Sequence, residues 1–519
     1  METGERQGAC RCDSLRVENS LLHSIFVHGG TDFDSVVSQF ELQPFSQEVV
    51  FEQEIPTSHS DDPLPGNDSI QSLHTPEEII PLFPHCDAEE GYSIPMECIE
   101  EAYADEMKCH NTASSEPTED NHDDLVRSIN DHICIRLLRD VFHLPTALSS
   151  LLQDRIRQLC YPQHREGPLL LLCSDFKSFY LRHLHARTEA SALFSILASN
   201  GKTITRGDLH DLVTSVEESS EMLRQRLGDA AMADEYIITI VNVLLFRMAQ
   251  RCTDSITEQE CLRSDLLRQL HALEVTPSQA LAAGWFGVDA FYVLWRAFNQ
   301  LDQDADGYLT AADLRGYSDG ALTDLAIERV VAGAGRGGAK EVCGVIDYEE
   351  FVCLLLADQN KRAPEAMRYW FRVLDLNCTG VVDEECVRAF FLSQQQHLEE
   401  CGVECLPYDQ FYTSICDLLG KKAAFFTLTD FLPSAAQSAL PRVLQCEAVN
   451  MLVNSELFLK QERQEMPVLE CVEGLEMRYA DWELFVAREF QEESGESESH
   501  GVHGALESGE MSYDTVMQQ

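Results

Sequence analysis

The chain is poor in basic residues. Its 519 residues include 38 Lys and Arg against 88 Asp and Glu, which gives a formal net charge of −50. Proteins that coat a nucleic acid duplex need clustered cations to neutralise phosphates and release counterions. We therefore expect no nucleic acid among the partners. Hydrophobic residues make up 44% of the chain, which is enough for two or three folded domains besides tails.

The sequence also lacks a hydrophobic run long enough to span a bilayer. Its best apolar run, from Tyr236 to Phe246, has about half the required length and contains Asn242. We therefore expect no membrane insertion. The chain begins without an apolar signal segment, and its 19 cysteines include no C-x-x-C pair, so they are predicted to be reduced thiols. A cytoplasmic location is expected, with the nucleus as the alternative.

Recognisable catalytic motifs are missing as well. The chain has no G-x-S-x-G elbow, no H-E-x-x-H helix and no kinase H-R-D with D-F-G. The run Gly207–Asp211 contains the G-D-x-H pattern of metallophosphatases but has none of the companion motifs. The glycines between Gly333 and Gly338 lack the G-K-[ST] ending of a phosphate loop. We predict no catalytic or cofactor-binding residues, and therefore no enzyme.

One short pattern recurs along the middle of the chain. It consists of an apolar residue, three further positions, and an acidic residue followed by an apolar one. The copies are Ile204 to Asp208, Ile256 to Glu260, Leu309 to Asp313, Ile346 to Glu350 and Phe426 to Asp430, and a copy at Val382 has Cys386 in place of the acid. In an EF-hand the apolar residue is loop position 8, which pairs with the same position of a partner hand, and the acid is position 12 at the start of the exit helix. We predict up to six EF-hand-like helix-loop-helix units in pairs.

The negative charge is concentrated at the two ends of the chain. The first 125 residues contain 28 acidic and 4 basic residues, and the last 29 contain 7 acidic and none basic. Such segments, with turn-forming clusters, are typical of disorder, whereas the middle shows amphipathic helical periodicity. We predict a mainly α fold with these parts: an acidic disordered arm at 1–125, a helical domain with degenerate EF-hand-like units at 126–280, an EF-hand domain at 281–440, a C-terminal helical segment at 441–490 and an acidic disordered tail at 491–519.

The run Asp302–Asp313 satisfies the complete calcium-loop pattern. It has carboxylates at positions 1, 3 and 5 and glycine at position 6, where the loop turns sharply. Calcium is a hard cation that takes six to eight oxygen ligands. The predicted ligands are Asp302, Asp304, Asp306, the Tyr308 carbonyl and Asp313, with Thr310 as a weaker one. Aspartate at position 12 is shorter than the usual glutamate, which would weaken calcium binding or favour magnesium.

A second run, Asp375–Cys386, is a weaker candidate. Its possible ligands are Asp375, Asn377, Thr379, Val381 and Asp383. Position 12 is Cys386, a soft sulfur where calcium prefers a bidentate carboxylate. The ligand count therefore favours weak or absent metal binding. The remaining loops have fewer oxygen donors, and we interpret them as scaffolding for their partners.

Several aromatic runs accompany these loops. They are Phe291–Trp295 before the first loop, Asp347–Val352, Arg368–Asp375, Phe390–Phe391 and Asp481–Phe490. Together with the loop at Asp302, these runs make the stretch from Trp285 to Leu419 resemble the B-double-prime (B'') class of protein phosphatase 2A regulatory subunits. Within that class the chain looks most like the gamma, or tonneau/fass, branch.

The resemblance implies a non-catalytic, calcium-binding regulatory subunit of a protein serine/threonine phosphatase 2A holoenzyme. Its partners would be the phosphatase scaffold and catalytic subunits and phosphoprotein substrates, and it would direct substrate choice or location. The branch points to centrosomal or cortical microtubule organisation. The alternative is a free-standing EF-hand cytoskeletal adaptor without a phosphatase partner.

Overall fold

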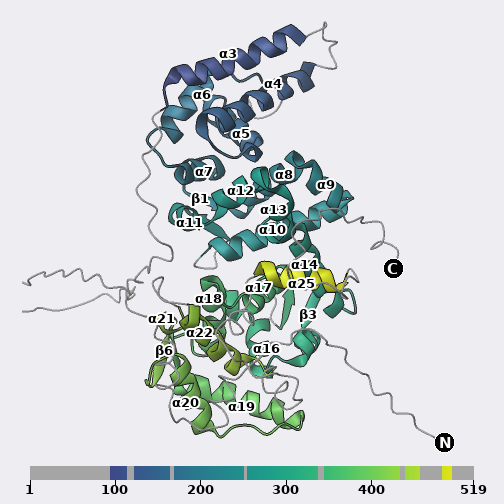
Figure 1. The fold of residues 1–519 in the computed structure, drawn as a ribbon, viewed down its shortest axis with the longest axis vertical. Helices are drawn as coiled ribbons and strands as arrows, with labels where there is room; N and C mark the ends of the chain where they lie inside the picture. Colours follow the sequence, from purple (N-terminus) through teal and green to yellow (C-terminus); the bar gives the residue numbers. More distant parts are fainter. Residues whose placement is uncertain are drawn as a thin grey trace, which may run out of the picture.

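The computed structural model describes residues 94–113, 122–163, 169–249, 254–336, 344–432, 439–455 and 482–493. The predicted mainly α fold is confirmed. Figure 1 shows an elongated stack with the N-terminal helices at one end and helices α19 (Glu384–Glu400) and α20 (Tyr408–Leu418) at the other. Two segments, 1–125 and 491–519, are predicted to be disordered, and of these, residues 1–93, 114–121 and 494–519 lie outside the described residues.

In the described part of the chain, three two-stranded antiparallel sheets define the order of the hands. The strands are β1 (Thr203–Thr205) with β2 (Ser255–Thr257), β3 (Tyr308–Thr310) with β4 (Val345–Asp347), and β5 (Val381–Asp383) with β6 (Phe425–Thr427). At their centres, Ile204 pairs with Ile256, Leu309 with Ile346, and Val382 with Phe426. All six of these side chains are buried. The predicted pairing of six units is therefore confirmed, and we number them hands 1 to 6 in chain order.

The first half of the molecule packs the first pair of hands against a layer of N-terminal helices. Its core contains large buried side chains such as Phe142, Tyr180 and Tyr236. The helices are α3 (Met96–Ala113), α4 (His122–Arg136), α5 (Ser149–Cys160), α6 (Cys173–Phe179), α7 (Glu189–Leu197), α8 (Arg206–Ser219), α9 (Glu221–Leu227), α10 (Ala230–Met248), α11 (Glu258–Arg263), α12 (Leu266–Val275) and α13 (Pro277–Ala283), with π-helical turns at Leu137–Phe142 and Tyr180–Leu184.

Helix α3 lies inside the segment predicted to be a disordered arm, and it corrects the predicted boundary at residue 125. Ile99 and Ala102 are buried against the first core, and the Tyr103 hydroxyl donates to the carbonyl of Leu171 at 3.1 Å. The high density of acidic residues masked an apolar face with helical spacing. The Ile94 amide already donates to the Tyr180 hydroxyl at 2.7 Å, and α3 packs against α4 and α6.

The second half contains hands 3 to 6 around a second core. Trp370, Phe351 and Phe390 are among its fully buried side chains. Its further helices are α14 (Val288–Leu301), α15 (Ala311–Leu314), α16 (Asp324–Val331), α17 (Tyr348–Gln359), α18 (Pro364–Leu374), α21 (Leu428–Phe431), α22 (Ala439–Val453) and α25 (Trp482–Glu493). None of the helices in the described ranges combines the length and apolarity that a bilayer crossing requires.

Helix α14 belongs to both cores, so the predicted boundary at residue 280 does not separate two independent units. Its Phe291 is buried in the first core, whereas Leu294 and Phe298 are buried in the second. An ion pair also crosses between the halves, from Arg206 Nη2 to Glu349 Oε2 at 3.1 Å. The entering helix of hand 3 is therefore held by both halves of the molecule.

The C-terminal helix α25 returns to the middle of the stack. Figure 1 shows it, in yellow, beside α14 and α17, and it contacts both as well as α13. Its Trp482 and Val486 are buried in the second core. The predicted C-terminal helical segment at 441–490 thus comprises most of α22 and α25, while residues 456–481 lie outside the described residues.

The centre of each strand pair should contribute strongly to stability. Ile256→Ala is expected to lower the free energy of unfolding of the protein by about 2–5 kcal/mol, because it leaves a cavity opposite Ile204. Ile238→Ala is the matched control, because Ile238 on α10 is 39% exposed. This substitution should change the free energy of unfolding by at most about 0.5 kcal/mol. Urea denaturation of both variants checks this. An equal loss of unfolding free energy in the two variants would show that the strand pair is not a packing centre.

Candidate metal centre

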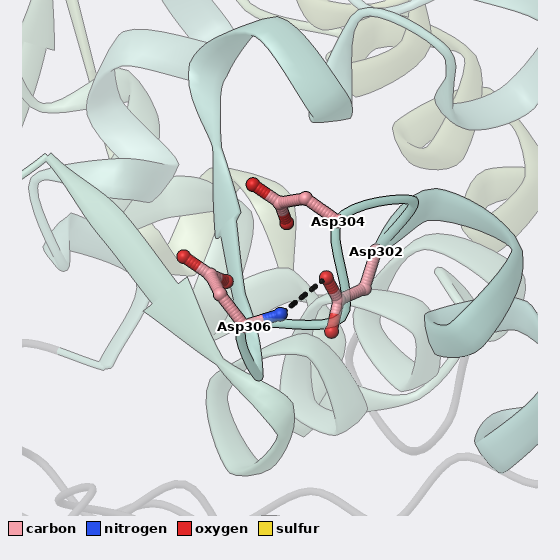
Figure 2. Close-up of side chains that lie close together, drawn as sticks. All are labelled: Asp302, Asp304 and Asp306. Atoms are coloured by element: carbon pink, nitrogen blue, oxygen red, sulfur yellow. Dashed lines mark hydrogen bonds between the residues drawn. The ribbon is translucent and has the colours of Figure 1, made fainter.

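The loop of hand 3 gathers three carboxylates. Asp302 follows the last residue of α14, and Asp304 and Asp306 follow it at alternate positions. One ligand oxygen from each of the three residues lies within 4.8 Å of the other two. Figure 2 shows the three side chains facing the same space inside the loop. Among the described residues this is the only such group of three potential metal ligands, and it consists of the residues predicted for positions 1, 3 and 5.

Backbone hydrogen bonds hold this loop in its curved form. Asp302, which is 8% exposed, accepts from the amides of Asp306 at 3.2 Å and Gly307 at 3.0 Å, one with each oxygen. Asp306 accepts from the amide of Tyr308 at 2.8 Å. Gly307 has φ of +81°, a conformation that side chains disfavour, so glycine is required where the loop turns.

The electrostatics of the loop favour a cation. The negative charge of Asp306 raises the pKa of the Asp304 carboxyl above its ordinary value, and the charge of Asp302 adds to this effect. Neighbouring carboxylates repel one another, and a divalent cation among them removes this repulsion. Three hard oxygen donors with this spacing fit calcium or magnesium better than a softer metal.

The other predicted ligands lie on β3 and α15, beyond the three carboxylates. Tyr308 exposes 45% of its surface and would contribute its carbonyl. Thr310 is the N-cap of α15, and its amide and hydroxyl donate to Asp313 Oδ2 at 2.8 and 2.7 Å. These hydrogen bonds lower the pKa of Asp313. Asp313 is thus tied to the start of its helix and is not part of the three-carboxylate group.

In hand 5, the weaker candidate, the carboxylates of Asp375 and Asp383 accept hydrogen bonds from backbone amides. Asp375 is buried and accepts from the amides of Thr379 at 3.0 Å and Gly380 at 2.7 Å. Asp383 accepts from the amide of Cys386 at 2.9 Å. Burial raises the pKa of the Cys386 thiol, which keeps it neutral and a poor ligand. Of the remaining predicted ligands, Asn377 is exposed, and the Val381 carbonyl accepts from the Thr379 hydroxyl at 3.3 Å.

Position 12 has a second role that the sequence reasoning missed. In five hands its carboxylate accepts from the backbone amide of the residue three positions earlier, and that residue is the N-cap of the exit helix. These capping boxes are Thr205 with Asp208, Thr257 with Glu260, Thr310 with Asp313, Asp347 with Glu350 and Thr427 with Asp430. The sequence signal was available, because a Thr or Asp three residues before an acid is the pattern of a capping box. The same bonds explain Asp208 in the G-D-x-H pattern without metal chemistry.

The chain is similar in sequence to a known domain family and to several known proteins. Residues 188–276, which include both strands of the first pair, match the model of an EF-hand domain family. The human B'' alpha regulatory subunit of serine/threonine-protein phosphatase 2A is 27% identical over 310 residues, which cover 58% of this chain and 26% of that protein. The TON2 B'' subunit of Arabidopsis thaliana is 33% identical over 160 residues, covering 30% of this chain and 33% of that protein.

A chain of a solved PP2A PR70 holoenzyme is also similar. It shares 28% identity and a TM-score of 0.47, and the match covers 53% of this chain and 98% of that chain. The chain spans 26% to 51% of the length of the B'' alpha, delta and beta regulatory subunits that it matches. Its curated homologues are B'' regulatory subunits, as predicted. Because alpha, beta, delta and gamma forms all match, the branch stays a prediction.

Proposed function

We propose, from this homology to B'' regulatory subunits, that the chain is a non-catalytic regulatory subunit of a protein serine/threonine phosphatase 2A holoenzyme. The observation that carries the proposal is the similarity to these proteins, combined with a fold built from paired EF-hands. Its partners are the phosphatase scaffold and catalytic subunits. Its role is to direct dephosphorylation of phosphoprotein substrates, through their choice or their location.

Hand 3 is the proposed calcium site of this protein. Asp302, Asp304 and Asp306 would hold the ion with side-chain oxygens and Tyr308 with its carbonyl, while Asp313 closes the loop from the exit helix. A bound calcium supplies positive charge that neutralises the three converging carboxylates. The short Asp313, already bonded to Thr310, is a weaker position-12 ligand than glutamate, and this supports moderate affinity and some tolerance of magnesium.

The position of α14 suggests how such a site regulates assembly. Asp302 lies directly at the C-terminal end of α14, whose Phe291 packs in the first core and whose Leu294 packs in the second. A change in the angle of this helix therefore acts on both halves of the molecule. A partner that prefers one angle by about 1–3 kcal/mol would bind about 5- to 150-fold more tightly in that state. A hand that only rigidifies its pair is the alternative outcome.

The proposed compartment is the cytoplasm, with the centrosome, the cytoskeleton or the nucleus as sites of action. Cys134, Cys261 and Cys446 are buried thiols that form no disulfide. Buried reduced cysteines such as these are typical of a reducing compartment.

The phosphatase partnership predicts co-purification. The tagged full chain, isolated from cells under native conditions, should recover the phosphatase scaffold and catalytic subunits in comparable amounts. The chain expressed alone should show no phosphatase activity towards phosphoserine or phosphothreonine peptides, because no catalytic group of its own is proposed. Reproducible recovery of cytoskeletal proteins without either phosphatase component would favour the free-standing adaptor instead.

Substitution of the proposed ligands in hand 3 should abolish calcium binding, whereas substitution in hand 5 should not. Asp302→Ala combined with Asp304→Ala should abolish the highest-affinity calcium isotherm in titration calorimetry, because two of the three converging carboxylates are removed. Asn377→Ala in hand 5 is the control and should leave that isotherm in place. An isotherm that survives the double substitution in hand 3 would disprove the assignment.

A longer acidic residue at loop position 12 is expected to raise the affinity for calcium. Asp313→Glu should tighten calcium binding by about tenfold, or about 1.4 kcal/mol, because the longer side chain can reach the ion with both oxygens. The same variant should bind magnesium no more tightly, since magnesium demands a smaller octahedral shell. Competition titrations with the two ions measure both effects. Unchanged calcium affinity would mean that position 12 does not contact the ion.

A further inference from the structure

Hand 1 has a cation at its position-12 carboxylate, and the protein itself supplies it. Arg155, on α5 outside the hand, is 8% exposed and reaches into the loop. Its Nε donates to the Ile196 carbonyl at 2.7 Å, and its Nη2 donates to the Leu197 carbonyl at 2.6 Å. The same Nη2 lies 3.1 Å from Oδ1 of Asp208, which is 3% exposed.

These contacts join the two places that calcium joins in a loaded hand. Ile196 and Leu197 end the entering helix α7, and Asp208 lies in the first turn of the exit helix α8 as position 12. The Ser199 amide of the loop donates to the same oxygen of Asp208 at 3.2 Å. The loop has no carboxylate at positions 1, 3 or 5, so the guanidinium is matched to the one negative charge at this point.

Hand 6 shows the same arrangement with a different residue. Lys421 occupies loop position 3, and its Nζ lies 2.7 Å from Oδ2 of Asp430, the position-12 acid. This pair is more accessible, with 34% of the Lys421 side chain and 17% of the Asp430 side chain exposed. The same Nζ lies 5.4 Å from the centroid of the Phe425 ring. Within the described residues, hand 1 of the first pair and hand 6 of the third pair therefore each contain an internal cation.

We propose that hands 1 and 6 are cation sites filled from within, by Arg155 and Lys421, and that these residues hold their pairs in the arrangement of a loaded hand whatever the calcium concentration. The middle pair differs, because hand 3 presents three carboxylates to an external ion. Calcium would therefore act on the middle pair alone, a consequence that rests on the proposed calcium site, whereas the internal cations do not depend on it.

The proposal makes charge at position 155 essential to hand 1. Removing one partner of a buried ion pair leaves the other charge uncompensated, which costs far more than the loss of an exposed pair. A role in packing alone would instead be preserved by an apolar side chain of similar length. Arg157 lies on the same helix α5 and pairs with Asp154 of that helix at 3.7 Å. It therefore provides a matched arginine for comparison.

Amide hydrogen exchange of the full chain in EGTA tests the proposal. Arg155→Met should accelerate exchange in α7 and α8 on the order of 100-fold, while Arg157→Met leaves these helices protected. Arg155→Ala should lose the same protection and regain it with millimolar methylguanidinium, which fits the vacated space and restores the charge. Arg155→Met, whose side chain fills that space, should show no such rescue.

Protection of α7 and α8 that persists in Arg155→Met, or an Arg155→Ala variant that methylguanidinium does not restore, would overturn the assignment for hand 1. If the Arg155 variants fail to fold, hand 6 decides. There, Lys421→Met should accelerate exchange in α21 and Lys421→Arg should not, and equal behaviour of the two variants would overturn the proposal. Because EGTA is present throughout, none of these outcomes depends on calcium binding at hand 3.

Discussion

The short strand pair between two loops, with a capping box at the exit helix of five hands, is the constraint on which the architecture depends. Ile204 and Ile256 form the centre of one such pair, and each strand runs directly into a capped helix. None of these bonds requires a metal. Hands that lack calcium ligands can therefore keep their shape, and an acid at position 12 can be retained for the helix it begins.

Because the scaffold does not depend on a metal, the loop of hand 3 differs from the others in what it adds to that scaffold. Hand 3 combines the common scaffold with three carboxylates that repel one another, and its entering helix α14 is packed into both cores. A change in charge at Asp302 therefore occurs at the end of a helix that both halves share. The ion pair between Arg206 and Glu349 and the packing of α25 connect the same region to more distant parts of the chain.

Much of this arrangement was predictable because it follows from local patterns. The apolar residue at position 8 predicted the register of all three sheets, down to the pairing of Val382 with Phe426. Alternate aspartates predicted the carboxylate group in hand 3. Helix α3 was missed because its acidic residues outweighed a narrow apolar face formed by Ile99 and Ala102. The capping boxes were missed although their spacing is visible in the sequence.

The sequence by itself determined which loops can present oxygen ligands, because ligand identity and spacing along twelve residues are local properties. Tertiary structure alone decided which charges and helices meet across long separations. Arg155 reaches Asp208 from a helix outside the hand, and α25 returns from the far end of the folded chain to pack against α14. Such contacts depend on how buried surfaces fit together in three dimensions, and no periodicity or short motif encodes that fit.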